Sequence, residues 1–426
     1  MQTNLADFIR DTPEGREADA ILRSCVHCGF CNATCPTYQL LGDELDGPRG
    51  RIYLIKQMLE GFPVTRRTQN HLDRCLSCRS CETTCPSGVN YHRLLDIGRG
   101  VIEQRVPRPF VERMTRYTLY TTIPNPGILK NAVNIGQLFR PLLPTALSEK
   151  LPDSAASQRP RVGRPAAPRQ RRMIALASCG QASLTPNTAA AAGRVLDRLG
   201  IEMVELESAG CCGALRYHLD AQQQALDDMR RVIDACWPYI EGIHSGGVEA
   251  IVMTASGCGL QVRAYGELLK HDPAYADKAA RISALTLDLS EVLAAEREGL
   301  MELLQLPAKE SAGERRRVAF HSPCTLQHGQ KIRGVVESLL AAAGYVLTPV
   351  VDAHLCCGSA GTYSITQPEL SKRLRDNKLA ALSEGSPDVF VTANIGCQTH
   401  LQSGSAIPVR HWIELIDERI DERRDD

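Results

Sequence analysis

The stretch CVHCGFCNATCP, residues 25–36, decides the fold of the first part of this chain. Its first three cysteines recur at every third position, and Cys35 then follows after three residues and directly precedes Pro36. The same spacing returns in CLSCRSCETTCP, residues 75–86. Three thiolates on a C-x2-C-x2-C loop can bind one face of a cubane iron–sulfur cluster, and in two-cluster ferredoxins the fourth cysteine binds the other cluster. The repeated run therefore predicts two [4Fe–4S] clusters with crossed ligation.

Crossed ligation divides the cysteines of the two runs into two ligand sets. A zinc site explains the runs less well, because it takes two C-x2-C pairs rather than three cysteines in one run. A disulfide framework is typical of short secreted chains, and this chain is neither short nor visibly secreted. The first predicted ligand set is Cys25, Cys28, Cys31 and Cys85, and the second is Cys75, Cys78, Cys81 and Cys35.

The composition is that of a globular protein with room for several domains. A length of 426 residues corresponds to about three domains. The 49 basic and 49 acidic residues give a formal net charge of zero, so the overall charge gives no indication of nucleic-acid binding. The N-terminus lacks a basic region followed by an apolar one, and no run of about 18 apolar residues occurs. We therefore expect a cytoplasmic protein, or one on the cytoplasmic face of a membrane.

The N-terminal half divides into three predicted parts. Residues 1–105 form a mainly helical dicluster ferredoxin-like domain, in which RGRIYLIKQMLEG has a helical apolar period. In this segment Arg49 and Arg51 either belong to a solvated turn or lie near a cluster, where their charge would raise its potential. Residues 106–150 are an apolar segment broken by prolines, which either packs on the protein's own core or forms a surface for a partner or a membrane. Residues 151–172 are a linker rich in proline and arginine.

The remainder of the chain is a tandem duplication. RRMIALASCGQ (171–181) corresponds to RRRVAFHSPCT (315–325), and EAIVMTASGCG (249–259) corresponds to DVFVTANIGCQ (388–398). Thirty-one residues separate Cys179 from Cys211 and also Cys324 from Cys356, and a Cys-Cys-Gly (CCG) triplet stands in each copy. This spacing predicts two repeated units. We place the first CCG unit at residues 173–308 and the second at residues 315–426.

Each CCG unit is predicted to be α/β, so the expected fold class is a multi-domain α+β protein. In parallel sheets, ligands gather at the carboxyl ends of the strands, where the cysteines of each unit fall. Each set is therefore a candidate metal site, and histidines near the second set make it the stronger candidate for a further iron–sulfur cluster. The second set is Cys324, Cys356, Cys357 and Cys397, near His321, His328, His354 and His400; the first is Cys179, Cys211, Cys212 and Cys258. Cys236 lies outside this pattern, and we interpret it as a buried structural thiol.

The two cysteine runs followed by two CCG units resemble the iron–sulfur subunits of respiratory dehydrogenases and heterodisulfide reductases. Three stretches make the chain most similar to the iron–sulfur subunit of glycolate oxidase: CVHCGFCNATCPTYQLLGDELDGPRGRIYLIKQ, HLCCGSAGTY and TANIGCQTHL. The likeness covers nearly the whole chain. One departure is that heterodisulfide reductases end each CCG unit in C-x2-C, where this chain has Gln261 and His400. The missing cysteines disfavour a double-cubane type of cluster.

The resemblance implies an electron-transfer subunit that lacks the substrate site. In such complexes, flavin-containing subunits oxidise glycolate to glyoxylate, and the iron–sulfur subunit passes the electrons toward a membrane acceptor, which we expect to be quinone. Cluster potentials span roughly −700 to +450 mV, so a cluster pair can connect a flavin with a quinone. The chain has no convincing G-x-G-x-x-G site or flavin fingerprint, so we expect no flavin in it.

Other functions remain open at this level. The partner flavoprotein could oxidise lactate or glycerol 3-phosphate instead. The CCG cysteines could perform thiol–disulfide chemistry as in heterodisulfide reduction, or form a thiol-rich pocket that docks the flavin subunit. A scaffold whose clusters only hold the fold is a further alternative, and two clusters that share ligands across one small domain argue against it. We also expect peripheral contact with the cytoplasmic face of the inner membrane, through residues 106–150 or through partner subunits.

Overall fold

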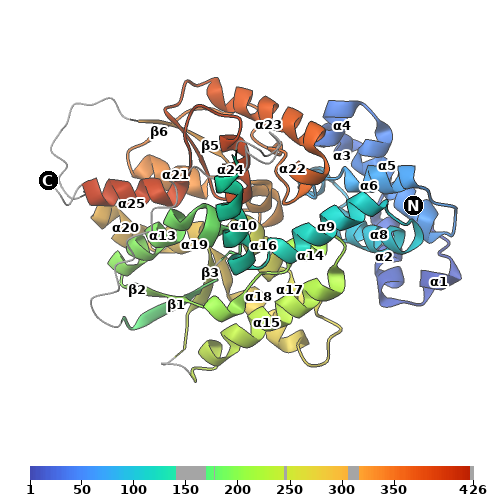
Figure 1. Cartoon of the computed structure of the whole chain (residues 1–426), viewed down its shortest axis with the longest axis horizontal. Coiled ribbons are helices and arrows are strands. Elements are labelled where there is room, and N and C mark those ends of the chain that lie inside the picture. The colour runs from blue at the N-terminus through green and yellow to red at the C-terminus, as the bar shows by residue number, and fades with distance from the viewer. Residues whose placement is uncertain (141–168, 177, 244–246, 306–315, 423–426) are drawn as a thin grey trace.

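The computed structural model describes residues 1–140, 169–176, 178–243, 247–305 and 316–422. A helical N-terminal region lies beside two α/β units, each built on a four-stranded parallel sheet (Figure 1). This arrangement confirms the fold class expected from the sequence. The predicted linker lies almost entirely outside the described residues, and the exact domain boundaries stay a prediction.

The N-terminal region is a bundle of short helices around one apolar core. Thr12 caps α2, because its side chain accepts a hydrogen bond from the amide of Gly15. Gly50 lets α5 pack closely, since a Cβ there would lie 2.1 Å from the carbonyl oxygen of Glu44. The core includes Ile55, buried on α5. The elements are α1 (Asp7–Arg10), α2 (Pro13–Ser24), α3 (Phe30–Ala33), α4 (Pro36–Leu41), the 3₁₀ turn η1 (Glu44–Asp46), α5 (Pro48–Leu59), α6 (Arg66–Asp73), α7 (Ser80–Thr84) and α8 (Tyr91–Arg105).

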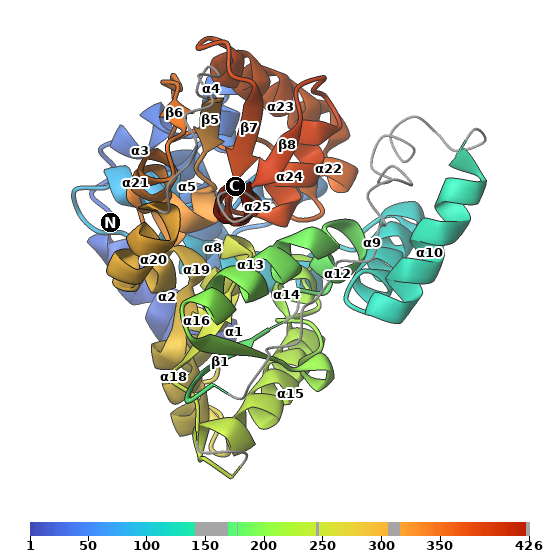
Figure 2. The same ribbon diagram turned by 90° about the vertical axis from the view of Figure 1, so that its left-hand side faces the viewer.

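Two helices, α9 (Phe110–Thr122) and α10 (Pro126–Leu138), follow the bundle and project from one side of the molecule (Figure 2). Arg116 on α9 forms ion pairs with Asp73 of the bundle and Asp220 of the first unit. Buried Arg108, just before α9, pairs with the same two carboxylates. These ion pairs fix α9 at the junction, whereas most apolar side chains of the two helices face outward.

The first CCG unit has the strand order β2-β1-β3-β4, with all neighbours parallel. The last strand ends at Asp288, and this residue is also the N-cap of helix α19. Asp288 and Glu291 form a capping box at the start of that helix. The elements are β1 (Arg171–Ala175), α12 (Gln181–Leu184), α13 (Pro186–Arg198), β2 (Ile201–Glu205), η4 (Glu207–Ala209), α14 (Ala214–His218), α15 (Gln222–Ile240), β3 (Ala250–Met253), α16 (Ser256–Arg263), α17 (Tyr265–Leu268), α18 (Ala276–Leu285), β4 (Thr286–Asp288), α19 (Leu289–Ala295) and α20 (Arg297–Gln305).

The second CCG unit repeats this topology with the order β6-β5-β7-β8. The edge strand β6 is short, because its regular pairing with β5 is confined to Val346 and Leu347. The elements are β5 (Arg317–His321), the π-helical turn η5 (Thr325–Gly329), α21 (Val335–Ala342), β6 (Val346–Leu347), α22 (Tyr363–Thr366), α23 (Pro368–Ser383), β7 (Val389–Thr392), α24 (Ile395–Gln402), β8 (Val409–His411) and α25 (Trp412–Glu422).

The two CCG units pack against each other through their helices. One apolar core contains residues of both sheets and of helices from both units, among them Val195 and Trp412. Polar contacts cross the same interface: Thr188 donates a hydrogen bond to Glu414 at 2.7 Å, and Arg194 pairs with Asp417. The two sheets are thereby held in a fixed relation to each other. Within the described parts of the chain, no helix is long and apolar enough to cross a membrane.

Candidate metal centres

Two neighbouring cavities in the N-terminal region contain the cysteines of the two runs. Cavity 1 encloses about 450 Å³ and cavity 2 about 300 Å³. They share a wall that includes Pro48, Cys81 and Tyr91. Cavity 1 is lined by Cys25, Cys28, Cys31, Cys81 and Cys85, and cavity 2 by Cys35, Cys75, Cys78 and Cys81. Each run therefore supplies its first three cysteines to one cavity and its fourth to the other.

The loops of both runs turn through left-handed backbone positions. These occur at His27 and Gly29 in the first run, with φ of 59° and 88°, and at Ser77 and Arg79 in the second, with φ of 52° and 59°. Alternation of right- and left-handed residues points successive amides to one concave side, which favours anionic groups such as thiolates. The amide of Ser77 donates to the sulfur of Cys75 at 3.5 Å. The loops thus resemble each other in conformation as well as in spacing.

Arg51 lies fully buried in the wall of cavity 2. Its Nε donates to the carbonyl oxygen of His71 at 2.7 Å, and its terminal nitrogens contact the hydroxyl of Thr37 at 3.2 Å and Asp46 at 3.4 Å. The Thr37 hydroxyl is in turn 3.3 Å from the sulfur of Cys35. Of the two interpretations that the sequence allows for Arg51, the solvated turn is wrong. A fixed positive charge stands beside the cysteines of cavity 2.

Several thiols of the cavities are buried, among them those of Cys25, Cys35 and Cys81. Burial raises the pKa of the Cys31 thiol to about 11, and it also raises the pKa of the Cys35 thiol. These groups therefore ionise only where a cation compensates for the lost hydration, as iron does in a cluster. Arg49 also lines cavity 1, where it forms an ion pair with Glu44.

The first CCG unit brings its cysteines together at the carboxyl ends of its strands. The sulfur atoms of Cys179 and Cys211 are 3.6 Å apart, and the thiol of Cys212 interacts with those of Cys211 and Cys258. Cys258 also contacts the Ser178 hydroxyl at 3.4 Å. The interaction between the first two thiols lowers the pKa of Cys211 and raises that of Cys179. This set is a thiol-rich pocket capable of binding a soft metal.

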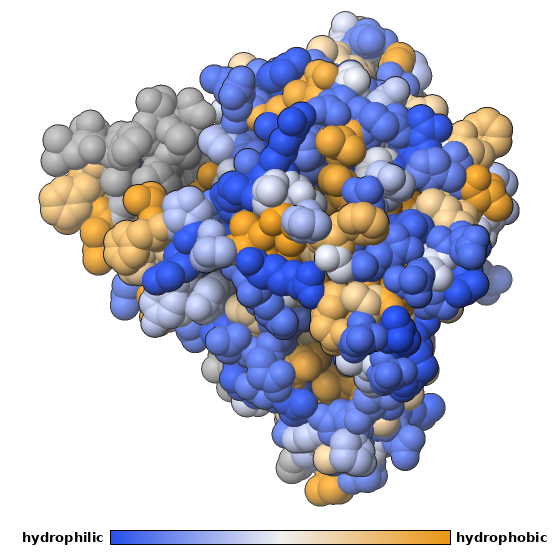
Figure 3. Space-filling view, turned by 90° about the vertical axis from the view of Figure 1, so that its right-hand side faces the viewer, coloured by the Kyte–Doolittle hydropathy of each residue, from blue (hydrophilic) through white to orange (hydrophobic). Residues whose placement is uncertain are grey.

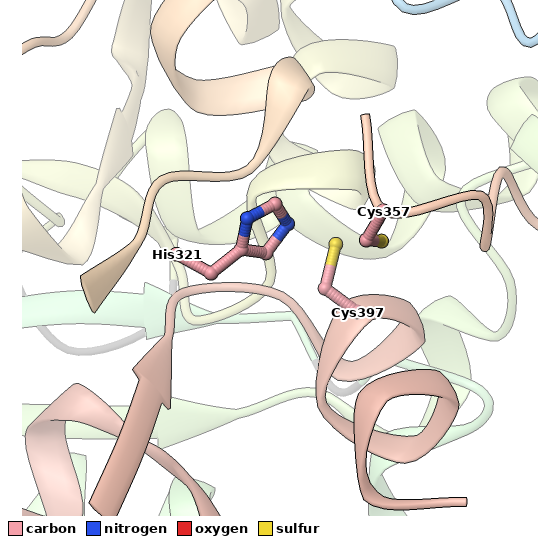
Figure 4. Close-up of side chains that lie close together, drawn as sticks. All are labelled: His321, Cys357 and Cys397. Atoms are coloured by element: carbon pink, nitrogen blue, oxygen red, sulfur yellow. The ribbon is translucent and has the colours of Figure 1, made fainter. Parts of the chain in front are cut away.

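The second CCG unit also brings its cysteines together, and it adds a histidine. The thiol of Cys356 interacts with those of Cys324 and Cys357, and Cys357 interacts with Cys397. The His321 ring lies beside the last two thiols, with its nearest ligand atom and their sulfurs all within 4.8 Å of one another. Figure 4 shows the ring close to the sulfur of Cys397 on α24 and to Cys357, which lies on the segment between β6 and α22. All three side chains are buried.

Two of the other histidines that the sequence groups with these cysteines, His328 and His400, have different partners. His328 uses one ring nitrogen to contact the Thr83 hydroxyl at 3.0 Å and the other to contact the carbonyl oxygen of His354 at 2.9 Å. The His400 ring contacts the Ser371 hydroxyl at 3.1 Å. His328 thus connects the second unit to the N-terminal region, and His400 supports the helix that follows the CCG turn. Among the expected histidines, His321 is the one placed against the cysteines.

The sequence did not predict that a cysteine of cavity 2 lies beside a cysteine of the second CCG unit. The thiol of Cys78, in cavity 2, interacts with the thiol of Cys324 in the second unit. Both belong to a buried apolar cluster that includes Leu76 and Tyr363, and the Tyr363 hydroxyl donates to the carbonyl oxygen of Arg74 at 3.2 Å. No local sequence signal reveals this contact, because the two segments are far apart in the chain.

Two family models match the chain. Residues 21–89 match a 4Fe-4S dicluster domain, which indicates two [4Fe–4S] clusters. Residues 174–263 and 318–402 each match the cysteine-rich CCG domain. These two matches coincide with the two sheets.

The curated relatives narrow this assignment. The chain is 54% identical to the glycolate oxidase iron-sulfur subunit of Escherichia coli (strain K12), over 421 residues that cover 99% of this chain and 100% of that protein. The chain belongs to the glycolate oxidase iron–sulfur subunits. A probable glycolate oxidase iron-sulfur subunit of Bacillus subtilis (strain 168) is 30% identical over 90% of this chain and 89% of its own length. A lactate utilization protein A of Bacillus licheniformis is 26% identical over 55% of this chain and 93% of its own length.

Membership in the glycolate oxidase iron–sulfur subunits confirms the resemblance stated from the sequence. The dicluster match over residues 21–89 also spans the cysteines of both runs, which line the two cavities. The residues fit [4Fe–4S] clusters, because each cavity is lined by four or more cysteines, by apolar side chains and by at least one arginine, Arg49 in cavity 1 and Arg51 in cavity 2.

Proposed function

We propose that this chain is the electron carrier of a complex that oxidises glycolate to glyoxylate, with the substrate site on flavin-containing partner subunits. The electrons would leave the flavin one at a time and continue toward a membrane quinone. The observation that carries this proposal is the common wall of cavities 1 and 2. A scaffold has no need of two adjacent redox groups, whereas electron transfer requires them to be close.

We propose crossed ligation for the two clusters. It is supported by the cysteines that line each cavity, since Cys85 accompanies the first run in cavity 1 and Cys35 accompanies the second run in cavity 2. Cys81 lies in the common wall, and we assign it to cavity 2 with Cys75 and Cys78 because all three belong to the same cysteine run. When bound, such clusters take up and release single electrons.

We also propose a further iron–sulfur centre in the second CCG unit. Its cysteines are buried and in contact with one another, and the thiol set continues from the wall of cavity 2. Among the described residues, the cysteines of the first unit form no group of possible metal ligands with a histidine, and we regard this unit as the weaker metal site.

For the location of the complex, we propose peripheral attachment to the cytoplasmic face of the inner membrane. The exposed apolar side chains of α9 and α10 support this proposal, including Phe110, Ile135 and Leu138. They belong to the segment whose helices Figure 2 shows projecting from the molecule. Interfacial binding grows with the apolar area that is buried.

The function is tested on the complex purified anaerobically with its partner subunits. Glycolate should bleach the visible absorbance of the clusters, and a quinone analogue should restore it. The isolated chain should bind no flavin and should not respond to glycolate. A complex whose clusters respond to lactate and not to glycolate would establish the alternative that the lactate utilization relatives favour.

A further inference from the structure

His321 is buried without any hydrogen-bond partner. It is 1% exposed, and within the described part of the chain neither ring nitrogen has a partner. A buried imidazole needs a partner for each nitrogen, because its lost hydration is otherwise not replaced. The atoms that its ring approaches are the sulfurs of Cys357 and Cys397. The His321 side chain therefore has the environment of a metal ligand, since it is buried, has no hydrogen-bond partner for its ring among the described residues and lies beside two thiols.

The position of His321 is special to the second unit. Val318 pairs with Val389 in the second sheet, and Met173 pairs with Ala250 at the equivalent place in the first. The residue three positions further along each strand is His321 in the second unit and buried Leu176 in the first. The cysteines are duplicated and the imidazole is not. A purely structural pocket would not call for this polar substitution at a fully buried position.

The cysteines of the second unit lead back to cavity 2. Interacting thiols connect Cys78 with Cys324, Cys324 with Cys356, and Cys356 with Cys357. In the first unit, the cysteine side chains interact with one another and with Ser178. The second unit thus has neighbouring cysteines that lead to one of the proposed cluster ligands, since Cys324 and Cys356 share a buried cluster with Cys78.

A buried cation stands near these cysteines. Lys378 is 3% exposed as a residue. Its ammonium donates to the carbonyl oxygen of Asp352 at 2.7 Å and lies close enough to Cys324, Cys356 and Cys357 to interact with their charges. A buried positive charge stabilises a site that carries several thiolates, and such a site needs compensation when a metal of low charge occupies it.

We propose that His321 is a nitrogen ligand of an iron centre in the second CCG unit, together with Cys357 and Cys397, and that this centre exchanges electrons with the cavity 2 cluster through Cys78 and Cys324. The proposal rests on the further iron–sulfur centre proposed above and names its non-cysteine ligand. Mixed imidazole and thiolate ligands suit iron or zinc. The direct link to a cluster ligand favours iron, because zinc has no redox chemistry.

The nitrogen ligand predicts in which direction electrons would flow between the cavity 2 cluster and the iron centre of the second unit. Replacement of thiolate by imidazole removes negative charge from iron and raises the reduction potential, as in Rieske centres. One electron would then pass from the reduced cluster of cavity 2 to oxidised iron in the second unit. The second unit would be the exit side of the chain, and flavin-derived electrons would enter at the other cluster.

The proposal is tested on the full chain prepared anaerobically with its partner subunits. Iron and zinc are counted per chain, and pulsed electron paramagnetic resonance searches the reduced and oxidised protein for coupling to a histidine nitrogen. The wild type should contain more iron than two [4Fe–4S] clusters supply, and one centre should show nitrogen coupling. His321→Leu, which introduces the residue of the first unit, should abolish this coupling and keep both clusters. His321→Cys should retain the extra iron without the coupling and shift its potential downward.

The matched control is His411→Leu, because His411 is a buried histidine on the same sheet that belongs to no group of possible metal ligands among the described residues. It should leave the iron content and the nitrogen coupling unchanged. Extra iron without histidine coupling in the wild type would overturn the ligation by His321 and leave the further centre standing. An iron content no higher than two [4Fe–4S] clusters supply would show that the second unit holds no iron centre. Zinc at this site would overturn the proposed electron transfer through Cys78 and Cys324.

Discussion

Cys35 and Cys75 line the same cavity, although they belong to different cysteine runs, and Cys31, only four positions before Cys35, lines the other. The reason is local. After α3 (Phe30–Ala33) the chain turns, and Pro36 starts α4 in a new direction. Cys35 is the residue at this corner, and its sulfur contacts Thr37 and the carbonyl oxygen of Asp46 on the far side.

We predict that Cys35→Ser damages the cluster bound by Cys75, Cys78 and Cys81 and spares the one bound by Cys25. About half of the iron of the cluster pair should be lost or converted to a three-iron form, since one cubane loses a ligand. Cys85→Ser should have the converse effect. Magnetic spectroscopy of the two variants distinguishes the clusters, and loss of the same signal in both would reject crossed ligation. Cys236→Ser, at a buried thiol on α15, is the control and should leave all iron in place.

A second prediction concerns the buried cation of cavity 2. Arg51→Gln removes a positive charge beside Cys35 and should lower the potential of that cluster, because reduction adds negative charge there. At an effective dielectric constant of about 20, a charge several ångströms away contributes roughly 1–3 kcal/mol, and about 1.4 kcal/mol corresponds to 59 mV for one electron. We therefore expect a decrease of about 40–130 mV in a redox titration.

The paired variant for this position is Arg51→Lys. It keeps the charge while it loses part of the hydrogen bonding to Thr37 and His71. If both variants shift the potential equally, packing rather than charge controls it. A cluster that is lost in both variants would show instead that the guanidinium is needed for assembly.

The sequence predicted which residues form the candidate sites better than it predicted the contacts between those sites. Cysteine spacing identified both runs and both CCG triplets, because metal ligation imposes fixed intervals. It could not show that Arg51 is buried, since DGPRGR also describes an exposed turn. The short strands β4 and β8 were missed, because three residues carry no readable alternation. The contact of Cys78 with Cys324 depends on how the second unit docks on the bundle, which no local pattern encodes.

A third prediction uses the capping box of α19. Burial raises the pKa of Asp288 to about 6, from an unfolded value of 3.8. The folded chain therefore binds this proton more tightly, so the group's contribution to stability is present at low pH and is lost as pH rises through about 6. Asp288→Asn keeps the side-chain oxygen that caps the helix and removes the titration.

We expect the stability of Asp288→Asn relative to the wild type to increase by about 1 kcal/mol between pH 5.5 and 7.5. Anaerobic thermal melting of both proteins across this range measures the difference. A constant difference would show that Asp288 has an ordinary pKa in the folded protein. Glu296→Gln, at the end of α19, serves as a control for the general loss of a carboxylate.

The last prediction concerns the surface formed by α9 and α10. The sequence allowed either core packing or an outward-facing surface, and among the described residues of these helices Arg116 and Val133 are the buried ones. The exposed apolar side chains gather on one projecting face, which the space-filling view shows at the left (Figure 3). Ile135, Leu138 and Phe139 are 59%, 76% and 48% exposed. Exposed apolar side chains in such a group mark an interaction surface.

Replacement of these three residues by Ser or Gln should release the complex from membranes while the cluster spectra stay normal, because exposed positions change stability by only about 0.5 kcal/mol. Membrane flotation and quinone reduction measure the effect. Phe62→Gln is the matched control, since this side chain is 54% exposed on another part of the chain. If the variant loses the flavin subunits as well as its membrane attachment, the surface binds the partner rather than lipid. If the variant stays attached to the membrane and quinone reduction is normal, the membrane anchor lies elsewhere.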